Sequence, residues 1–132
     1  PCAYDSRMNT KLNAQGLPEG YNFRPDWEVT PRDVKAMRER GDDFVLIDCR
    51  KPDEFAAAHI EGSELVPLQE IASRLPGLED DKGRKIVVHC HHGGRSLQFA
   101  HVLRKAGFKD VKSMAGGILL WNKDINPGGP QY

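Results

Sequence analysis

The stretch that decides the fold of this chain reads KIVVHCHHGGRS and spans residues 85–96. Its first part, 85–89, is a nearly continuous apolar run, which is typical of a strand buried on both faces of a parallel sheet. Cys90 follows that strand at once. The glycine pair 93–94 then leads into a pattern of apolar residues at helical spacing. We therefore predict a strand, a cysteine, a glycine loop and a helix, in this order.

Strands and helices alternate through the rest of the chain. Further strands are expected at 44–47, 64–66 and 110–114. Helices are expected at 31–40, 52–58, 68–75, 95–106 and 116–121, with a charged loop at 76–83. An alternation of this kind favours an α/β fold in which a parallel sheet carries helices on both faces.

Length and composition favour a single globular domain. The 132 residues are 39% hydrophobic and 29% charged, and 19 basic residues balance 19 acidic ones. A net charge of zero argues against a protein that wraps nucleic acid or binds membranes through basic residues, and no apolar run is long enough to cross a bilayer. Residues 1–26 are polar and lack periodicity, so we expect an N-terminal arm there and one domain over 27–132.

The number and spacing of the cysteines indicate a protein of a reducing compartment. Cys2, Cys49 and Cys90 form an odd and sparse set with no C-x-x-C pair, which argues against a disulfide framework, a zinc ribbon and a thioredoxin-type site. The histidines that flank Cys90 are nearly consecutive and lack the usual ligand spacing, so they are not expected to hold a metal. We predict a cytoplasmic protein without metal or cofactor.

Two candidate site segments follow strands of the predicted sheet. Ligands of open α/β sheets bind at the carboxyl ends of the strands, where residues 48–50 read DCR and residues 90–96 read CHHGGRS. In the second segment, glycine N–H groups, a helix N-terminus and the Arg95 cation are expected to surround a thiolate on Cys90 and lower its pKa. A cysteine that merely follows a strand is more often a small buried residue, and that is our interpretation of Cys49. A role of Cys49 as a resolving thiol one strand away from Cys90 stays open as the alternative.

The sequence resembles the rhodanese-like family over about residues 27–121. The resemblance rests on the segments IDCR at 47–50, EF at 54–55, HIEGS at 59–63, VHCHHGGRS at 88–96 and MAGG at 114–117, with Trp121. It implies a five-stranded parallel sheet flanked by helices. It also implies a sulfurtransferase that moves a sulfane sulfur from thiosulfate or a related donor to a thiophilic acceptor, without a metal or cofactor.

The resemblance also assigns roles to individual residues. Cys90 is implied as the nucleophile that carries the sulfur as a persulfide. The loop that cradles the persulfide is implied to consist of His91, His92, Gly93, Gly94, Arg95 and Ser96, with the Arg95 charge facing the cradle. Asp48 and Arg50 are expected to support the site by ionic and hydrogen bonds without taking part in the chemistry. His91 and His92 are expected at the loop mouth, where partial protonation helps an anionic donor to bind.

Two alternative functions stay open. One alternative is a cysteine phosphatase or an arsenate reductase, enzymes that carry a Cys-x5-Arg motif. In this chain only the four residues 91–94 separate Cys90 from Arg95. This shorter loop leaves too little room for a tetrahedral oxyanion. The other alternative is a non-enzymatic rhodanese-like module for regulation or protein docking. Such modules often lack the cysteine that this chain keeps, although the polar arm of residues 1–26 is compatible with docking.

The end of the chain suggests a partner. Residues 121–132 are similar to the tail of rhodanese domains fused behind the adenylating enzymes of cofactor sulfuration. This similarity implies a protein sulfur acceptor, such as a small sulfur-carrier protein. The expected partners are therefore a small anionic sulfur donor and a protein acceptor, and neither nucleic acid nor a membrane.

Overall fold

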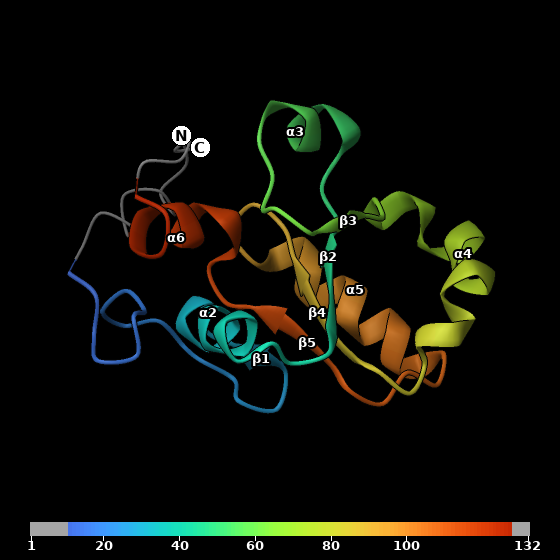
Figure 1. The fold of residues 1–132 in the computed structure, drawn as a ribbon, viewed down its shortest axis with the longest axis horizontal. Coiled ribbons are helices and arrows are strands. Elements are labelled where there is room, and N and C mark those ends of the chain that lie inside the picture. The colour runs from blue at the N-terminus through green and yellow to red at the C-terminus, as the bar shows by residue number, and fades with distance from the viewer. Residues whose placement is uncertain (1–10, 128–132) are drawn as a thin grey trace.

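A five-stranded, all-parallel sheet forms the centre of the molecule (Figure 1). The computed structural model describes residues 11–127. The strand order is β1-β5-β4-β2-β3. The strands are β1 (Glu28–Val29), β2 (Phe44–Asp48), β3 (Glu64–Leu65), β4 (Lys85–His89) and β5 (Val111–Met114). The predicted parallel α/β sheet is therefore confirmed, and the strand before Cys90 occupies its middle position.

Helices cover both faces of this sheet. They are α2 (Pro31–Arg40), α3 (Pro52–Ala57), α4 (Ile71–Arg74), α5 (Gly94–Lys105) and α6 (Gly117–Asp124), with the 3-10 helices η1 (Leu68–Glu70) and η2 (Leu75–Asp81). Local signals define α2, because Thr30 caps it through a capping box, Pro31 begins it and Gly41 ends it with a φ of 73°. Within the described range, none of these helices is long and apolar enough to cross a membrane.

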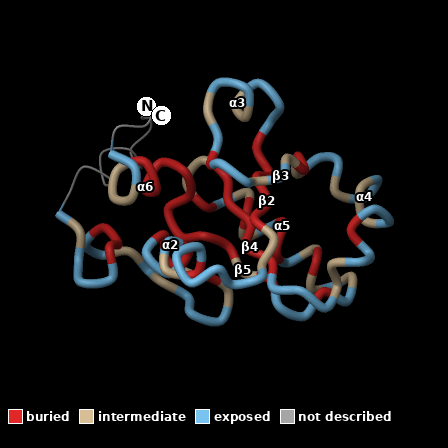
Figure 2. Tube along the Cα trace, in the orientation of Figure 1, coloured by how far each residue is buried: buried red, intermediate tan, exposed pale blue. Residues whose placement is uncertain are grey.

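Alternate side chains of β2 and β4 face two separate hydrophobic clusters. Ile47 and Val88 belong to the cluster that α5 and the segment 68–81 cover. Leu46 and Val87 belong to the opposite cluster, which α2 and α6 cover. Figure 2 shows both strands as largely buried, which explains why their sequences are continuous apolar runs. The prediction of helices on both faces is confirmed.

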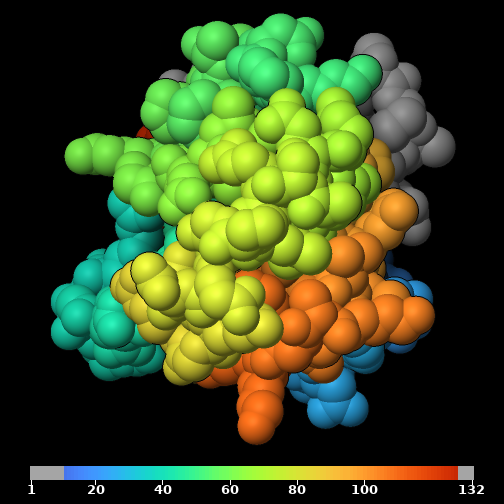
Figure 3. All heavy atoms as spheres, turned by 90° about the vertical axis from the view of Figure 1, so that its right-hand side faces the viewer, coloured from blue at the N-terminus to red at the C-terminus, as the bar shows by residue number. Residues whose placement is uncertain are grey.

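The chain between β3 and β4 is more helical than the sequence predicts. In place of one helix over 68–75 and a loop over 76–83, the structure has η1, α4 and η2 in succession over 68–81. Pro76 lacks an N–H and cannot continue the hydrogen bonds of α4. Leu78 is buried in the core and holds the following turn in place. Figure 3 shows this segment packed over α5.

The hydrophobic pattern of the sequence does not predict the edge strand β1. It has two residues, too few to show an alternation. Glu28 is in register with Ser113 of β5, and Val29 with Met114. β1 is thus the fifth strand that the family resemblance implies but the hydrophobic pattern does not reveal.

Residues 11–26, which belong to the expected N-terminal arm, contact the rest of the domain. Leu17 is buried and packs in one cluster with Leu119 of α6. The Tyr21 hydroxyl donates a hydrogen bond of 2.6 Å to the buried carboxylate of Glu28 in β1. This part of the arm is therefore attached to the domain by apolar packing and by several hydrogen bonds.

The first turn of α6 supports the loop that follows β4. The Ile118 N–H donates to the Cys90 carbonyl at 2.9 Å, and the Leu119 N–H donates to the His91 carbonyl at 3.0 Å. Gly117 has a φ of 60° and lies so close to these two carbonyl groups that a Cβ atom would overlap both. Glycine is therefore required at position 117 by the backbone angle and by the available space.

We expect a Gly117→Ala substitution to destabilise the protein by about 2–4 kcal/mol, because it adds left-handed strain and an overlap with backbone atoms that cannot rotate away. Urea denaturation measures this change in the free energy of unfolding. Gly77→Ala is the matched control, since Gly77 has no atom near its hypothetical Cβ and should change stability by no more than about 0.5 kcal/mol. Equal denaturation midpoints for the two variants would contradict the packing described for α6.

Candidate active site

The two candidate segments meet at the carboxyl edge of the sheet. Cys90 follows β4, and the loop 90–93 joins it to α5. On the neighbouring strand, Asp48 ends β2 and is followed by Cys49 and Arg50. The short helix α3 stands above this edge, with its residues exposed or half-buried (Figures 1 and 2). The structure therefore brings both segments to one place.

Hydrogen-bond donors surround the buried Cys90 thiol. The Gly93 N–H points at Sγ across 3.1 Å, and the φ of 117° at Gly93 makes this loop turn possible. The Ser96 Oγ lies 3.5 Å from Sγ, and the Ser96 N–H also hydrogen-bonds the thiol. These residues lie at the N-terminal turn of α5, whose dipole favours a negative charge.

These contacts hold the pKa of Cys90 well below its ordinary value. The largest contribution is a side-chain hydrogen bond with Cys49. Ser96 and Gly93 also favour the thiolate, whereas burial opposes it. The thiolate is the nucleophilic form of cysteine. Cys90 is therefore an activated thiol in a pocket of N–H and O–H donors.

Ser113 of β5 extends this set of donors, although sequence reasoning missed it. Its hydroxyl lies 2.7 Å from the Ser96 Oγ, and both serines are buried. Ser96 has one hydroxyl proton, which can go to the Gly93 carbonyl at 3.1 Å or toward Cys90. If Ser113 donates to Ser96, the Ser96 proton stays available for the thiolate. Only the pairing of β4 with β5 brings the two serines together.

Asp48 and Arg50 form a buried, bidentate ion pair beside the Cys90 loop. The Nε–Oδ1 and Nη2–Oδ2 distances are 3.0 and 2.8 Å, and both residues have 0% of their surface exposed. The Arg50 Nη2 also donates to the Ala58 carbonyl at 2.6 Å, which ties the chain after α3 to β2. Loss of one partner from such a pair typically costs about 3–5 kcal/mol, because the other charge stays buried.

His89 is the buried neighbour of this ion pair. Its Nε2 lies 3.7 Å from Asp48 Oδ2 and makes no hydrogen bond, and its Nδ1 lies 3.3 Å from the Cys90 carbonyl oxygen. Burial lowers the pKa of His89, so the ring is neutral at pH 7. Among residues 11–127, no group of three or more His, Cys, Asp or Glu side chains is arranged to hold a metal ion.

Arg95 has an ionic partner that the sequence does not reveal. Its two Nη atoms contact the carboxylate of Glu54 in α3 at 2.7 and 3.1 Å. This pair lowers the pKa of Glu54 to about 2. From the residue pattern we expect the Arg95 charge to face the cradle, and the structure shows its guanidinium paired with Glu54. Glu54 belongs to the EF motif at 54–55, on which the family resemblance partly rests. That motif is the sequence feature that could have pointed to this contact.

The two remaining loop histidines lie side by side. The rings of His91 and His92 are 5.5 Å apart at an angle of 71°, and both residues are half-buried. They follow Cys90 directly in the loop, and their expected contact with an incoming donor stays a prediction.

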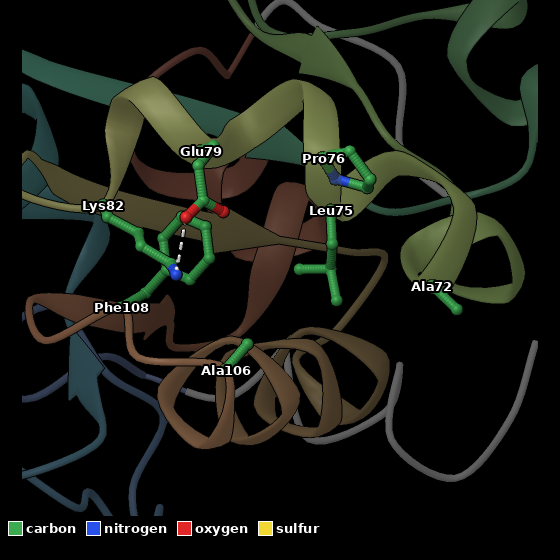
Figure 4. Close-up of a pocket in the computed structure, with 7 residues that line it drawn as sticks. All are labelled: Ala72, Leu75, Pro76, Glu79, Lys82, Ala106 and Phe108. Carbon is green, nitrogen blue, oxygen red and sulfur yellow. Dashed lines mark ion pairs between the residues drawn. The ribbon is translucent and has the colours of Figure 1, made fainter.

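A separate apolar hollow lies at the far end of α5 (Figure 4). It is lined by Ala72, Leu75, Pro76, Glu79, Lys82, Ala106 and Phe108. The Cys90 loop is at the N-terminal end of this 12-residue helix and the hollow is beyond its C-terminal end, which places them about 18 Å apart along the helix axis. The hollow is therefore distinct from the candidate active site.

Comparison with known proteins gives a consistent family match. Residues 30–124 match the model of the family described as rhodanese-like domain. The thiosulfate sulfurtransferase GlpE of Pseudomonas fluorescens is 39% identical over 93 residues, which cover 70% of this chain and 82% of that protein. The solved structure of a human single-domain sulfurtransferase, TSTD1, has a TM-score of 0.67 and 23% identity, covering 74% of this chain and 96% of that one.

A longer relative resembles nearly the whole chain. The adenylyltransferase and sulfurtransferase MOCS3-1 of Zea mays is 28% identical over 134 residues. The match covers 98% of this chain but only 29% of that protein. The chain thus spans less than a third of this relative.

We expect Ser96→Ala to raise the pKa of Cys90, because it removes a hydrogen bond to the thiolate and a hydrogen bond to a charged group is worth about 1.5–3 kcal/mol. The pH dependence of iodoacetamide alkylation, followed by peptide mass mapping, reports this pKa. Ser73→Ala is the control, since the exposed Ser73 hydroxyl bonds only the Glu70 carbonyl. An unchanged alkylation profile in Ser96→Ala would remove that serine from the stabilisation of the thiolate.

Proposed function

Because the chain belongs to the rhodanese-like domain family, we propose that it is a sulfurtransferase that carries a sulfane sulfur as a persulfide on Cys90. The observation that carries the proposal is the buried, activated thiol within 3.1 Å of the Gly93 N–H, at the N-terminus of α5. The similarity to a thiosulfate sulfurtransferase supports thiosulfate as a donor.

The loading step needs only the thiolate. The Cys90 sulfur attacks the outer sulfur of thiosulfate, and the bond between the two thiosulfate sulfurs breaks. Sulfite leaves with the bonding electron pair, so no general acid is required. The resulting persulfide anion stays in the same cradle, where N–H groups stabilise its charge as an oxyanion hole stabilises oxygen.

The unloading step transfers the outer sulfur to a nucleophile. An acceptor thiolate or cyanide attacks the outer sulfur, and Cys90 leaves as the same stabilised thiolate that began the cycle. A protein acceptor is supported by the match of nearly the whole chain to a protein named as both adenylyltransferase and sulfurtransferase. His91 and His92, which follow Cys90 in the loop, are the residues proposed to meet the incoming reactant.

The loop argues against phosphate-ester chemistry. Only residues 91–94 separate Cys90 from Arg95, and the Gly93 N–H already lies 3.1 Å from the sulfur. The Arg95 guanidinium is engaged by the carboxylate of Glu54. This arrangement suits a single sulfur atom better than a tetrahedral phosphate.

Incubation with thiosulfate should add one sulfur, about 32 Da, to the wild-type chain, and cyanide should remove it. Intact mass spectrometry of samples quenched with acid within seconds of mixing measures this change. Cys90→Ser should gain no mass, whereas Cys2→Ser should behave as the wild type. If Cys90→Ser takes up sulfur as fast as the wild type, another thiol carries the sulfur and the proposal is wrong.

Replacement of Glu54 by Gln should lower the KM for thiosulfate by roughly two- to fivefold, with little change in kcat, because a partly exposed ion pair contributes about 0.2–1 kcal/mol. Release of Arg95 makes its charge available to the dianionic donor. Arg95→Ala should raise the KM instead. Steady-state kinetics measures both, with Glu70→Gln as a control at a surface pair with Arg74. A KM that is equal in Glu54→Gln and the wild type would show that this carboxylate does not compete with the donor.

A further inference from the structure

The strand register places a second thiol beside Cys90. β2 and β4 are paired over five residues, and the last pair is Asp48 with His89. The next backbone bond, from the Cys49 N–H to the His89 carbonyl at 3.0 Å, continues the ladder. Cys49 and Cys90 are therefore the next two residues in register.

The two side chains also point to the same face of the sheet. Both cysteines belong to the hydrophobic cluster that contains Ile47 and Val88, each two residues earlier on its own strand. Neighbouring strands lie about 4.7–4.9 Å apart, within the separation of about 4.4–6.8 Å that a disulfide spans between Cα atoms. The general spacing of neighbouring strands therefore suits a disulfide between these two positions.

The electrostatics of the pair shift the two thiol pKa values in opposite directions. The interaction with Cys90 is the largest cause that raises the pKa of Cys49, and burial raises it further. The same interaction lowers the pKa of Cys90. Within the pair, the proton is therefore held more strongly by Cys49 than by Cys90.

We propose that Cys49 is a second catalytic thiol, which discharges the Cys90 persulfide internally by releasing hydrosulfide and closing a Cys49–Cys90 disulfide. The inference rests on the proposed persulfide of Cys90. It adds a second fate for the bound sulfur, in competition with transfer to an acceptor. Cys49 has 0% of its surface exposed, so an external thiol cannot take its place without opening the core.

The step is balanced without an added oxidant. The Cys49 proton first passes to the outer sulfur of the persulfide anion, which leaves Cys49 as a thiolate. The Cys49 thiolate then attacks the Sγ atom of Cys90, the bond between Sγ and the outer sulfur breaks, and the protonated outer sulfur leaves with that electron pair as hydrosulfide. The outer sulfur is reduced while the Cys49 sulfur is oxidised to the disulfide level. Proximity favours the reaction, because both groups are held in place. An external dithiol then reopens the disulfide.

The test follows the mass of the loaded chain over time. Inorganic tetrasulfide loads the protein briefly without oxygen, and gel filtration removes the excess. The wild-type chain should first gain about 32 Da and then fall to about 2 Da below the reduced chain, with release of about one hydrosulfide per chain. Digestion without a reductant should yield a peptide that links Cys49 to Cys90. Cys2→Ser should do the same.

Cys49→Ser and Cys49→Ala should keep the added sulfur at least tenfold longer. The serine variant retains a hydrogen-bond donor beside Cys90, so it separates loss of the second thiol from loss of thiolate stabilisation. Retention of the sulfur in any Cys49 variant also shows that its active site is folded and reactive.

The outcomes separate this inference from the proposed function. If the wild type keeps the sulfur as long as Cys49→Ser, or if the linked peptide contains Cys2, the role of Cys49 is overturned and the proposed sulfur transfer survives. If thiosulfate loads neither protein but the tetrasulfide-loaded wild type closes the disulfide, Cys49 keeps its role and thiosulfate is excluded as the donor. If tetrasulfide loads neither protein at Cys90, both proposals fail.

Discussion

The in-register pairing of β2 with β4 is the constraint on which the rest of the site depends. Because the two strands end level with each other, the ion pair of Asp48 and Arg50 lies beside the first residue of the Cys90 loop. A slip of the register by one residue would turn Cys49 or Cys90 to the other face of the sheet. The burial of both strands on both faces prevents such a slip, since each position has a defined apolar or polar environment.

Most charged groups at the carboxyl edge of the sheet are paired with each other, and the Cys90 thiolate is the anion available for reaction. The charges of Asp48 and Arg50 neutralise each other in the core, and His89 is kept neutral by burial. Arg95 is engaged by Glu54 at the exposed side. The Cys90 thiolate is therefore stabilised mainly by hydrogen bonds from Cys49, Ser96 and Gly93, and it also interacts with the Arg95 cation. Fixed dipoles of this kind stabilise a thiolate and a persulfide alike.

The Cys90 loop is held from two directions. The N–H groups of Gly93, the N-cap of α5, and of Ser96 in its first turn point at the sulfur, and the first turn of α6 donates to the carbonyls of Cys90 and His91. Donors on one side and bound carbonyls on the other keep the loop amides oriented toward the thiol. Such prior orientation reduces the reorganisation that a change from thiolate to persulfide requires. The glycine pair 116–117 makes the close approach of α6 possible.

The amino-acid sequence by itself determined the central strands, the order of elements and the position of Cys90 in a glycine loop before a helix. These features depend on periodicity and on residues close together in the chain. Only the tertiary structure decided that Ser113 contacts Ser96, that Glu54 holds Arg95, and that the two-residue β1 completes the sheet. It also decided that Cys49, which the sequence indicates as a packing residue, contacts the nucleophile. The reason is physical: these contacts join residues 17 to 85 positions apart, and their pairing is set by strand register and helix packing, which local sequence does not encode.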